Sequence, residues 1–302
     1  MINKQLIFIG LFCVGSQLHS EVNNNSNIET TVDFSQGYRR DKLDVTVSKN
    51  NQQPTFKAKN RYTSIDVYTS RLAMTLRKND FFLKGLAGYG NVCQGKFRSQ
   101  EHINNRHTEF SSNYKASKDL TGDYTADFAL TFGKDFSLES GWTISPTIGY
   151  GVYIQDFHTN HGKFCIRTSD YENRHGKSNK RRYKATWYSP QLGLNIRKSI
   201  SETLSGCFNY SFLFPLSYQA SGYANGSMKK YSHFEDENKA YKSFGNIATI
   251  GLNWNFATNW SLKPEIELMK FYSKGGDSGH IDHLKSVHRT AAEYRVVLGY
   301  VF

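Results

Sequence analysis

Long runs of alternating side chains constrain this chain more than any other feature. From Trp142 to Ile154 the even positions hold Trp, Ile, Pro, Ile, Tyr, Val and Ile, and the odd positions from Thr143 to Gly151 hold only Thr, Ser and Gly. Successive side chains of a β-strand point to opposite faces, so such a run has one apolar face and one small, polar face. The pattern recurs at 124–132, 188–196, 260–268 and 292–302. An all-β fold is therefore predicted.

The apolar faces are too uniformly large for the core of a soluble sheet protein, which mixes large and small side chains that interdigitate. Aromatic residues gather toward the strand ends: Trp142, Tyr150, Tyr188, Phe212, Phe214, Trp254, Trp260, Tyr294 and Tyr300. The runs of about 9 to 14 residues match the ~9–11 residues of a tilted membrane strand. No apolar run of 18 residues follows the N-terminal segment, which excludes a helical membrane protein. The pattern predicts an antiparallel transmembrane β-barrel, with lipid in place of a core.

Ten strands are predicted, at 28–39, 61–77, 81–92, 122–136, 142–155, 184–198, 203–218, 241–256, 260–272 and 291–302. The alternation slips in phase near Thr69 to Arg71, which predicts a bulge in the second strand. Short turns alternate with long connections at 40–60, 93–121, 156–183, 219–240 and 273–290. Because outer-membrane barrels have short periplasmic turns and long extracellular loops, both termini are expected in the periplasm.

The N-terminus has the character of a targeting segment. Lys4 precedes the short apolar run from Leu6 to Val14, and small residues follow it. Residues 1–20 are predicted to be a signal peptide, cleaved after Ser16 or Ser20, and residues 21–302 to be one barrel domain in the bacterial outer membrane, with its loops at the cell surface.

The order of the strands resembles the omptin family of ten-stranded outer-membrane proteases. The resembling stretches are L-K-G-L-A-G-Y-G at 83–90, S-P-T-I-G-Y-G at 145–151, Y-S-P-Q-L-G-L-N at 188–195 and F-N-Y-S at 208–211. The final strand, with Tyr300 and Phe302, is similar to the signal that such barrels present to the barrel assembly machinery. The resemblance covers essentially the whole mature chain and implies an omptin-like layout.

The catalytic residues that the resemblance would imply are not matched. Where omptins have Asp-x-Asp after the third strand, this chain reads N-V-C-Q-G-K-F-R-S-Q-E at 91–101, and 212–222 lack the Asp-x-His expected after the seventh. The one Asp-x-His, Asp156 to His158, ends the fifth strand and continues its lipid-facing row. We therefore expect no protease activity.

The inner face is predicted to carry charges of both signs, at Asp33, Arg39, Lys84, Asp123, Asp127, Arg197, Lys263, Glu265, Glu267, Glu293 and Arg295. These charges could line a narrow pore for small solutes, and this porin-like channel is the predicted function. They could instead form a salt-bridged plug in a small barrel. The alternative functions are a surface adhesin or lipopolysaccharide-interacting scaffold and, third, an omptin-type endopeptidase.

The chain carries a net charge of +12, with much of the basic excess at 39–61 and 158–182. A basic rim would attract anionic solutes or the phosphates of lipopolysaccharide, whereas export makes nucleic acid an unsuitable partner. Cys93 and Cys165 could form a disulfide at the mouth, and Cys207 is expected to stay free or to cross-link between molecules. No metal or cofactor is expected, and the oligomeric state stays open. Cysteine-bearing barrels also occur among porins of chlamydia-related bacteria, but no residue motif of that group is matched.

Overall fold

The structure is a computed structural model that describes residues 28–49, 56–103, 106–115, 123–159, 163–168, 171–177, 181–214, 216–224, 232–238, 243–274 and 282–302. The predicted signal peptide lies outside these residues. Among the described residues no helix has the length and apolar character to cross a membrane.

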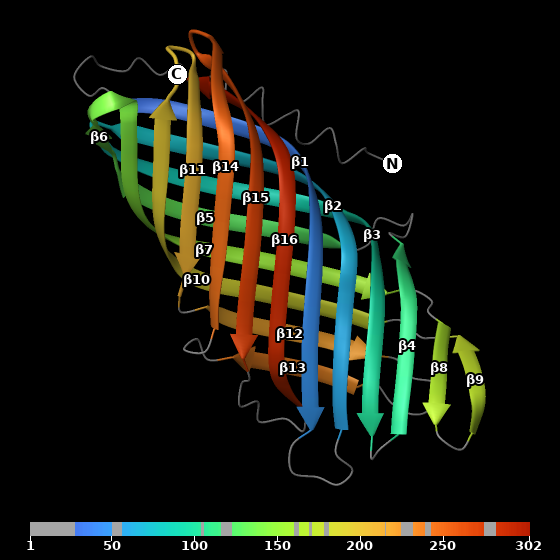
Figure 1. Cartoon of the computed structure of the whole chain (residues 1–302). Coiled ribbons are helices and arrows are strands. Elements are labelled where there is room, and N and C mark those ends of the chain that lie inside the picture. Colours follow the sequence, from blue (N-terminus) through green and yellow to red (C-terminus); the bar gives the residue numbers. More distant parts are fainter. Residues whose placement is uncertain are drawn as a thin grey trace, which may run out of the picture.

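Ten antiparallel strands form a closed ring, which confirms the predicted fold class (Figure 1). In ring order they are β1 (Ile28–Lys49), β2 (Phe56–Lys78), β3 (Phe81–Ile103), β5 (Tyr124–Lys134), β7 (Trp142–Thr159), β10 (Arg181–Ser199), β11 (Leu204–Leu213), β14 (Ser243–Ala257), β15 (Trp260–Lys274) and β16 (Asp282–Val301). The first and last strands close the ring, from Thr31 opposite Val301 to Lys49 opposite Asp282. Because every ring strand is paired on both sides, the barrel has no open edge in the membrane.

Shorter strands extend the sheet beyond the ring. On one side β4 (Arg106–Lys115) pairs with β3, and β8 (Lys163–Thr168) and β9 (Tyr171–Lys177) follow it in the sheet. On the other side β12 (Ser217–Ala224) pairs with β10, and β13 (Ser232–Asn238) pairs with β12. At the opposite end, β6 (Phe136–Leu138) and a 3-10 turn (Glu139–Gly141) precede β7. Several of the long connections that we predicted as loops are therefore partly sheet.

The lipid belt is an outer face of exposed apolar side chains. Examples are Leu130, Ile148, Leu192, Ile250 and Tyr294, each 55–62 % exposed. The predicted terminal residues belong to the same belt, since Phe302 is 59 % exposed and the Tyr300 ring packs against Trp260. An apolar surface of this extent is stable only in contact with lipid, so the belt marks the membrane-spanning part of the wall.

Above the belt, toward the extracellular end, the apolar face changes sides. In β1 the belt residue Tyr38 faces outward, but Leu43 and Val45, at odd positions, are buried inside the barrel. In β10 Leu192 faces lipid, whereas Trp187 and Ala185 are fully buried. Water replaces lipid outside this part of the wall, so the apolar residues turn inward, as in a soluble sheet. The strands run several residues past their predicted ends, because those ends were predicted from the lipid-facing pattern and the strands continue beyond the lipid.

The predicted bulge in the second strand is present but displaced. The pairing of β2 with β3 shifts between Thr63 and Val67, and Ser64 has a positive φ of 50°. Thr69 and Arg71 stay in regular register, opposite Gly90 and Gly88. The predicted position near Thr69 to Arg71 was therefore wrong, because both residues keep the regular alternation of the inner face and the register shift lies before them.

Candidate functional site

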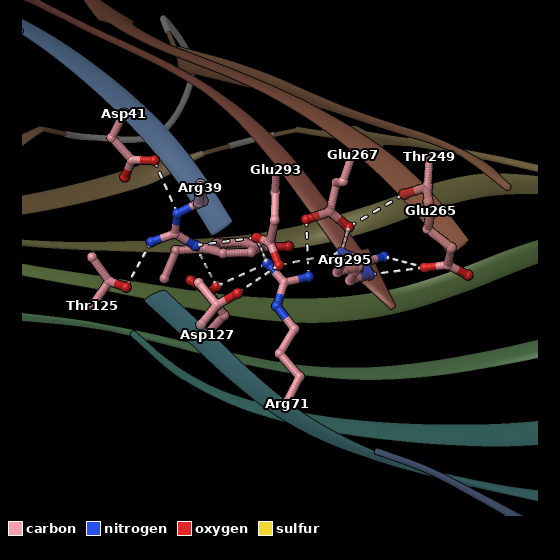
Figure 2. A network of polar contacts seen from close by, with 12 residues as sticks. Arg39, Asp41, Arg71, Thr125, Asp127, Thr249, Glu265, Glu267, Glu293 and Arg295 are labelled. Atoms are coloured by element: carbon pink, nitrogen blue, oxygen red, sulfur yellow. Dashed lines mark hydrogen bonds and ion pairs between the residues drawn. The ribbon is translucent and has the colours of Figure 1, made fainter. Parts of the chain in front are cut away.

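The middle of the lumen is filled by a network of buried charges (Figure 2). Arg71 lies at its centre, with Nη1 at 2.9 Å from Glu267 Oε1 and Nη2 at 2.7 Å from Glu293 Oε2 and 3.3 Å from Asp127 Oδ2. Arg295 contacts Glu267 and Glu265, each at 2.8 Å. The network joins β2, β5, β15 and β16, so it ties opposite walls of the barrel together (Figure 2).

Arg39 extends this network toward the extracellular end. Its guanidinium lies 2.9 Å from both Asp41 and Asp127 and donates a hydrogen bond of 2.6 Å to Thr125 Oγ1. Arg289 then contacts Asp41 at 3.2 Å. Arg39, Asp41 and Arg289 have no exposed surface. Charges so deeply buried are tolerated only when they are paired, as these are.

A hydrophobic closure lies above the charge network. We use this name for the buried cluster of Leu43, Val45, Tyr62, Ile65, Val67, Val92, Phe97, Tyr153, Phe157, Tyr183, Ala185, Trp187, Leu213, Leu216, Tyr218, Ala220, Phe271 and Val287. Trp187 packs on Tyr218 and Phe271, with ring centroids 4.4 and 5.6 Å apart. Arg289 joins the two layers, since its guanidinium lies 5.2 Å from the Phe271 ring.

Most of the predicted lumen charges do lie on the inner face. Near the periplasmic end Lys263 pairs with Asp33 at 2.8 Å, and Lys84 and Arg197 share the inner rows of their strands. Asp123 was wrongly placed in the lumen. Asp123 Oδ1 accepts a hydrogen bond of 2.7 Å from the backbone N–H of His158 and lies 3.0 Å from the ring Nδ1 of the same residue. β5 begins only at Tyr124, so the strand alternation from which the lumen position was predicted does not reach Asp123.

Three charged members of the network were missed by the sequence prediction. Arg71 fell at the misplaced bulge, whereas Asp41 and Arg289 fell in segments expected to be loops. Continuing the inner row of odd positions past Arg39 and back from Glu293 would have found Asp41 and Arg289.

The Asp156-Phe157-His158 segment follows the regular alternation of β7. Phe157 is buried in the hydrophobic closure, so Asp156 and His158 belong to the outer face, as their parity predicted. His158 Nδ1 lies 3.8 Å from Asp156 Oδ1. Within the described part of the chain no group of three or more His, Cys, Asp or Glu residues could hold a metal ion.

The structure does not bring Cys93 and Cys165 together. Cys93 is a free thiol, and so is Cys207. Cys165 of β8 lies opposite Glu109, which lies opposite Gln100 of β3. Cys93 lies seven residues from Gln100 along β3, or about 23 Å at the usual rise per residue, so the predicted bridge cannot form in this register.

A closed antiparallel ring of membrane-length strands, with an apolar outer belt and a polar lumen, defines an integral outer-membrane β-barrel protein. The family model described as "Pom: Protochlamydia outer membrane protein" matches residues 33–294. The chain belongs to this family. No curated protein matches it in sequence.

Among solved structures the chain is similar to the outer membrane protease OmpT from Escherichia coli, with a TM-score of 0.70 and 11 % identity, over 91 % of this chain and 97 % of that chain. This likeness confirms the omptin-like layout and, at that identity, shows the fold alone. Ail of Yersinia pestis matches with a TM-score of 0.29 and 12 % identity over 90 % of this chain and 99 % of that chain, and the toluene transporter TodX of Pseudomonas putida with 0.31 and 7 % over 89 % of each. Scores this low carry no argument about function.

Proposed function

We propose that this outer-membrane protein is a closed barrel that serves as a binding scaffold at the cell surface. The observation that supports the proposal is the hydrophobic closure. Trp187, Tyr218 and Phe271 are fully buried across the extracellular half of the lumen, where a water-filled path would have to pass. Apolar side chains packed at this density exclude water and hydrated ions.

The extracellular sheet supports the scaffold role. The ring strands continue past the lipid belt on the extracellular side, the lower end of the barrel in Figure 1. There β4, β8 and β9 widen the sheet on one side and β12 and β13 widen it on the other. A rigid sheet held outside the membrane offers a larger binding surface than short loops do. This is the adhesin or lipopolysaccharide-interacting alternative that the sequence left open.

A narrow channel is the competing function. It is favoured by buried polar atoms in the lumen that find no hydrogen-bond partner among the described protein groups, including Arg71 Nε, Asp127 Oδ1 and Arg289 Nη1. Such atoms are places where water could enter the barrel. A channel would further require the hydrophobic closure to open.

Conductance in a planar bilayer decides between the two functions. The refolded wild type, with its barrel checked by heat-modifiable gel mobility, is expected to give no stable conductance. The double variant Trp187→Ala/Phe271→Ala, which empties the centre of the closure, is expected to leak, and Leu192→Ala on the lipid face of the same strand is expected to stay silent. Stable wild-type conductance whose selectivity changes in Glu265→Gln/Glu267→Gln would overturn the proposal in favour of the channel.

A further inference from the structure

Exposed basic residues gather on the outer wall of the barrel, next to the lipid belt on its extracellular side. They belong to β15, β16, β1, β2 and β3, which are neighbours in the ring (Figure 1). We define this basic collar by Arg40, Lys42, Lys59, Arg61, Lys96 and Lys270. The side chains of Arg40, Lys42 and Arg61 are 59, 51 and 42 % exposed. The basic excess that we had assigned to a rim of loops therefore lies in good part on the side of the barrel.

The strand register gives the collar its spacing. Lys42 and Lys270 both lie opposite Thr290 of β16, one on each side, so their Cα atoms are about 10 Å apart across two strand spacings. Arg40 follows the belt residue Tyr38 by two residues and Lys42 follows it by four, or about 7 and 13 Å along the strand. This is the depth at which lipid headgroups meet the wall of a membrane protein.

Positive charge is in excess within the collar. Asp66 pairs with Arg40 at 2.8 Å, and Asp44 lies 2.8 Å from Arg61 and 3.4 Å from Lys42. Six basic residues thus face these two acids on the outer face. The pKa of His288, next to the collar, is lowered first by burial and then by the nearby charges of Lys270, Lys42 and Lys59, against the opposing effect of Asp44.

The opposite wall has a different character at the same height. There the start of β5 and the end of β7 bring together Asp123, His158 and the buried Asp156, and the exposed Lys184 of β10 lies opposite Asp156. The collar therefore belongs to one side of the barrel and is not a uniform ring of solubilising lysines.

We propose that the basic collar binds the phosphorylated headgroups of lipopolysaccharide in the outer leaflet, side-on against β15, β16, β1, β2 and β3. Lysine and arginine stems can lie along the wall above the aromatic belt while their cations reach phosphates, and several such contacts add up. A soluble polyanion would be drawn by the same charge, but the collar faces the bilayer sideways, where a membrane lipid is already present. The proposal names a partner for the outer wall and does not depend on whether the lumen is closed.

The test measures binding of a rough-type, phosphorylated lipopolysaccharide to the full chain in detergent micelles. Lys42→Gln/Lys270→Gln should weaken binding by about tenfold or more, given the usual electrostatic contribution of each surface lysine near anionic lipid. Lys184→Gln, which removes an exposed lysine from the opposite wall, is the matched control and should bind as the wild type does. Enzymatically dephosphorylated lipopolysaccharide should bind the wild type as weakly as the double variant binds the intact lipid.

Several results would overturn the assignment. Equal binding by the double variant and the wild type, or an equal loss in Lys184→Gln, would remove the collar as the site. If soluble heparin or inorganic phosphate displaced the lipid at equal phosphate or sulfate concentration, the surface would be a general anion site and not a lipid site. Heat-modifiable mobility of each variant checks that the barrel is folded, and conductance, which tests the closed lumen, is measured separately.

Discussion

Removing the central cation of the lumen should destabilise the barrel far more than removing a cation from its surface. Arg71 contacts Glu267, Glu293 and Asp127, and its side chain is only 6 % exposed. In Arg71→Met the aliphatic stem is kept but Glu293 loses its contact at 2.7 Å. The two cations that then remain near Glu293 are Arg39, at 3.9 Å from its carboxylate, and Arg295, at 3.8 Å.

The expected cost follows from leaving buried carboxylates without compensation. Breaking a buried ion pair by removing one partner typically costs about 3–5 kcal/mol, because the remaining charge cannot be solvated. Arg61→Ala is the matched control, since it also removes an arginine bound to a carboxylate, Asp44, but from an exposed position on the same strand. Exposed pairs contribute about 0–1 kcal/mol.

Urea unfolding in lipid vesicles, followed by tryptophan fluorescence, gives both free energies. The double variant Arg71→Met/Glu293→Gln should recover part of the loss, because it removes one of the uncompensated charges, so the two substitutions should not be additive. A cost below about 1 kcal/mol for Arg71→Met, or strict additivity in the double variant, would refute the view that these charges stabilise the barrel as a coupled network.

Two further predictions concern the wall. A Cβ at Gly149 would lie 2.5 Å from the Leu130 carbonyl oxygen, so Gly149→Ala should cost about 1–3 kcal/mol by overpacking, whereas Gly85→Ala, with nothing within 4 Å, should be nearly neutral in the same urea titration. Burial alone would raise the pKa of Asp66, but the hydrogen bond from Arg40 helps to hold it at about 2. The folded-state pKa is depressed, so the pair stabilises the barrel above the ordinary carboxyl pKa, and the advantage of the wild type over Asp66→Asn should disappear as the pH falls from about 4 to 2. An advantage that persisted at pH 2 would contradict this assignment.

The alternation of side chains determined the fold class, the number of ring strands and the short turns. These features depend only on which face of a strand meets lipid, and a period of two with large apolar residues such as Trp142 and Tyr294 records that directly. Ring closure needed no further information, because every membrane strand must be paired on both sides.

Tertiary structure decided what the barrel encloses. Above the belt the solvent changes from lipid to water, so apolar residues such as Leu43 and Trp187 turn inward, and the local pattern resembles the end of a strand. Whether Arg71 and Glu293 line a pore or pair with each other depends on how the ring closes. They lie 222 residues apart in the chain, and only closure through β1 brings their strands, β2 and β16, close together. Alternation within one strand carries no information about which strands become neighbours. It therefore predicted which charges face the lumen, and only the closed barrel decided how they pair.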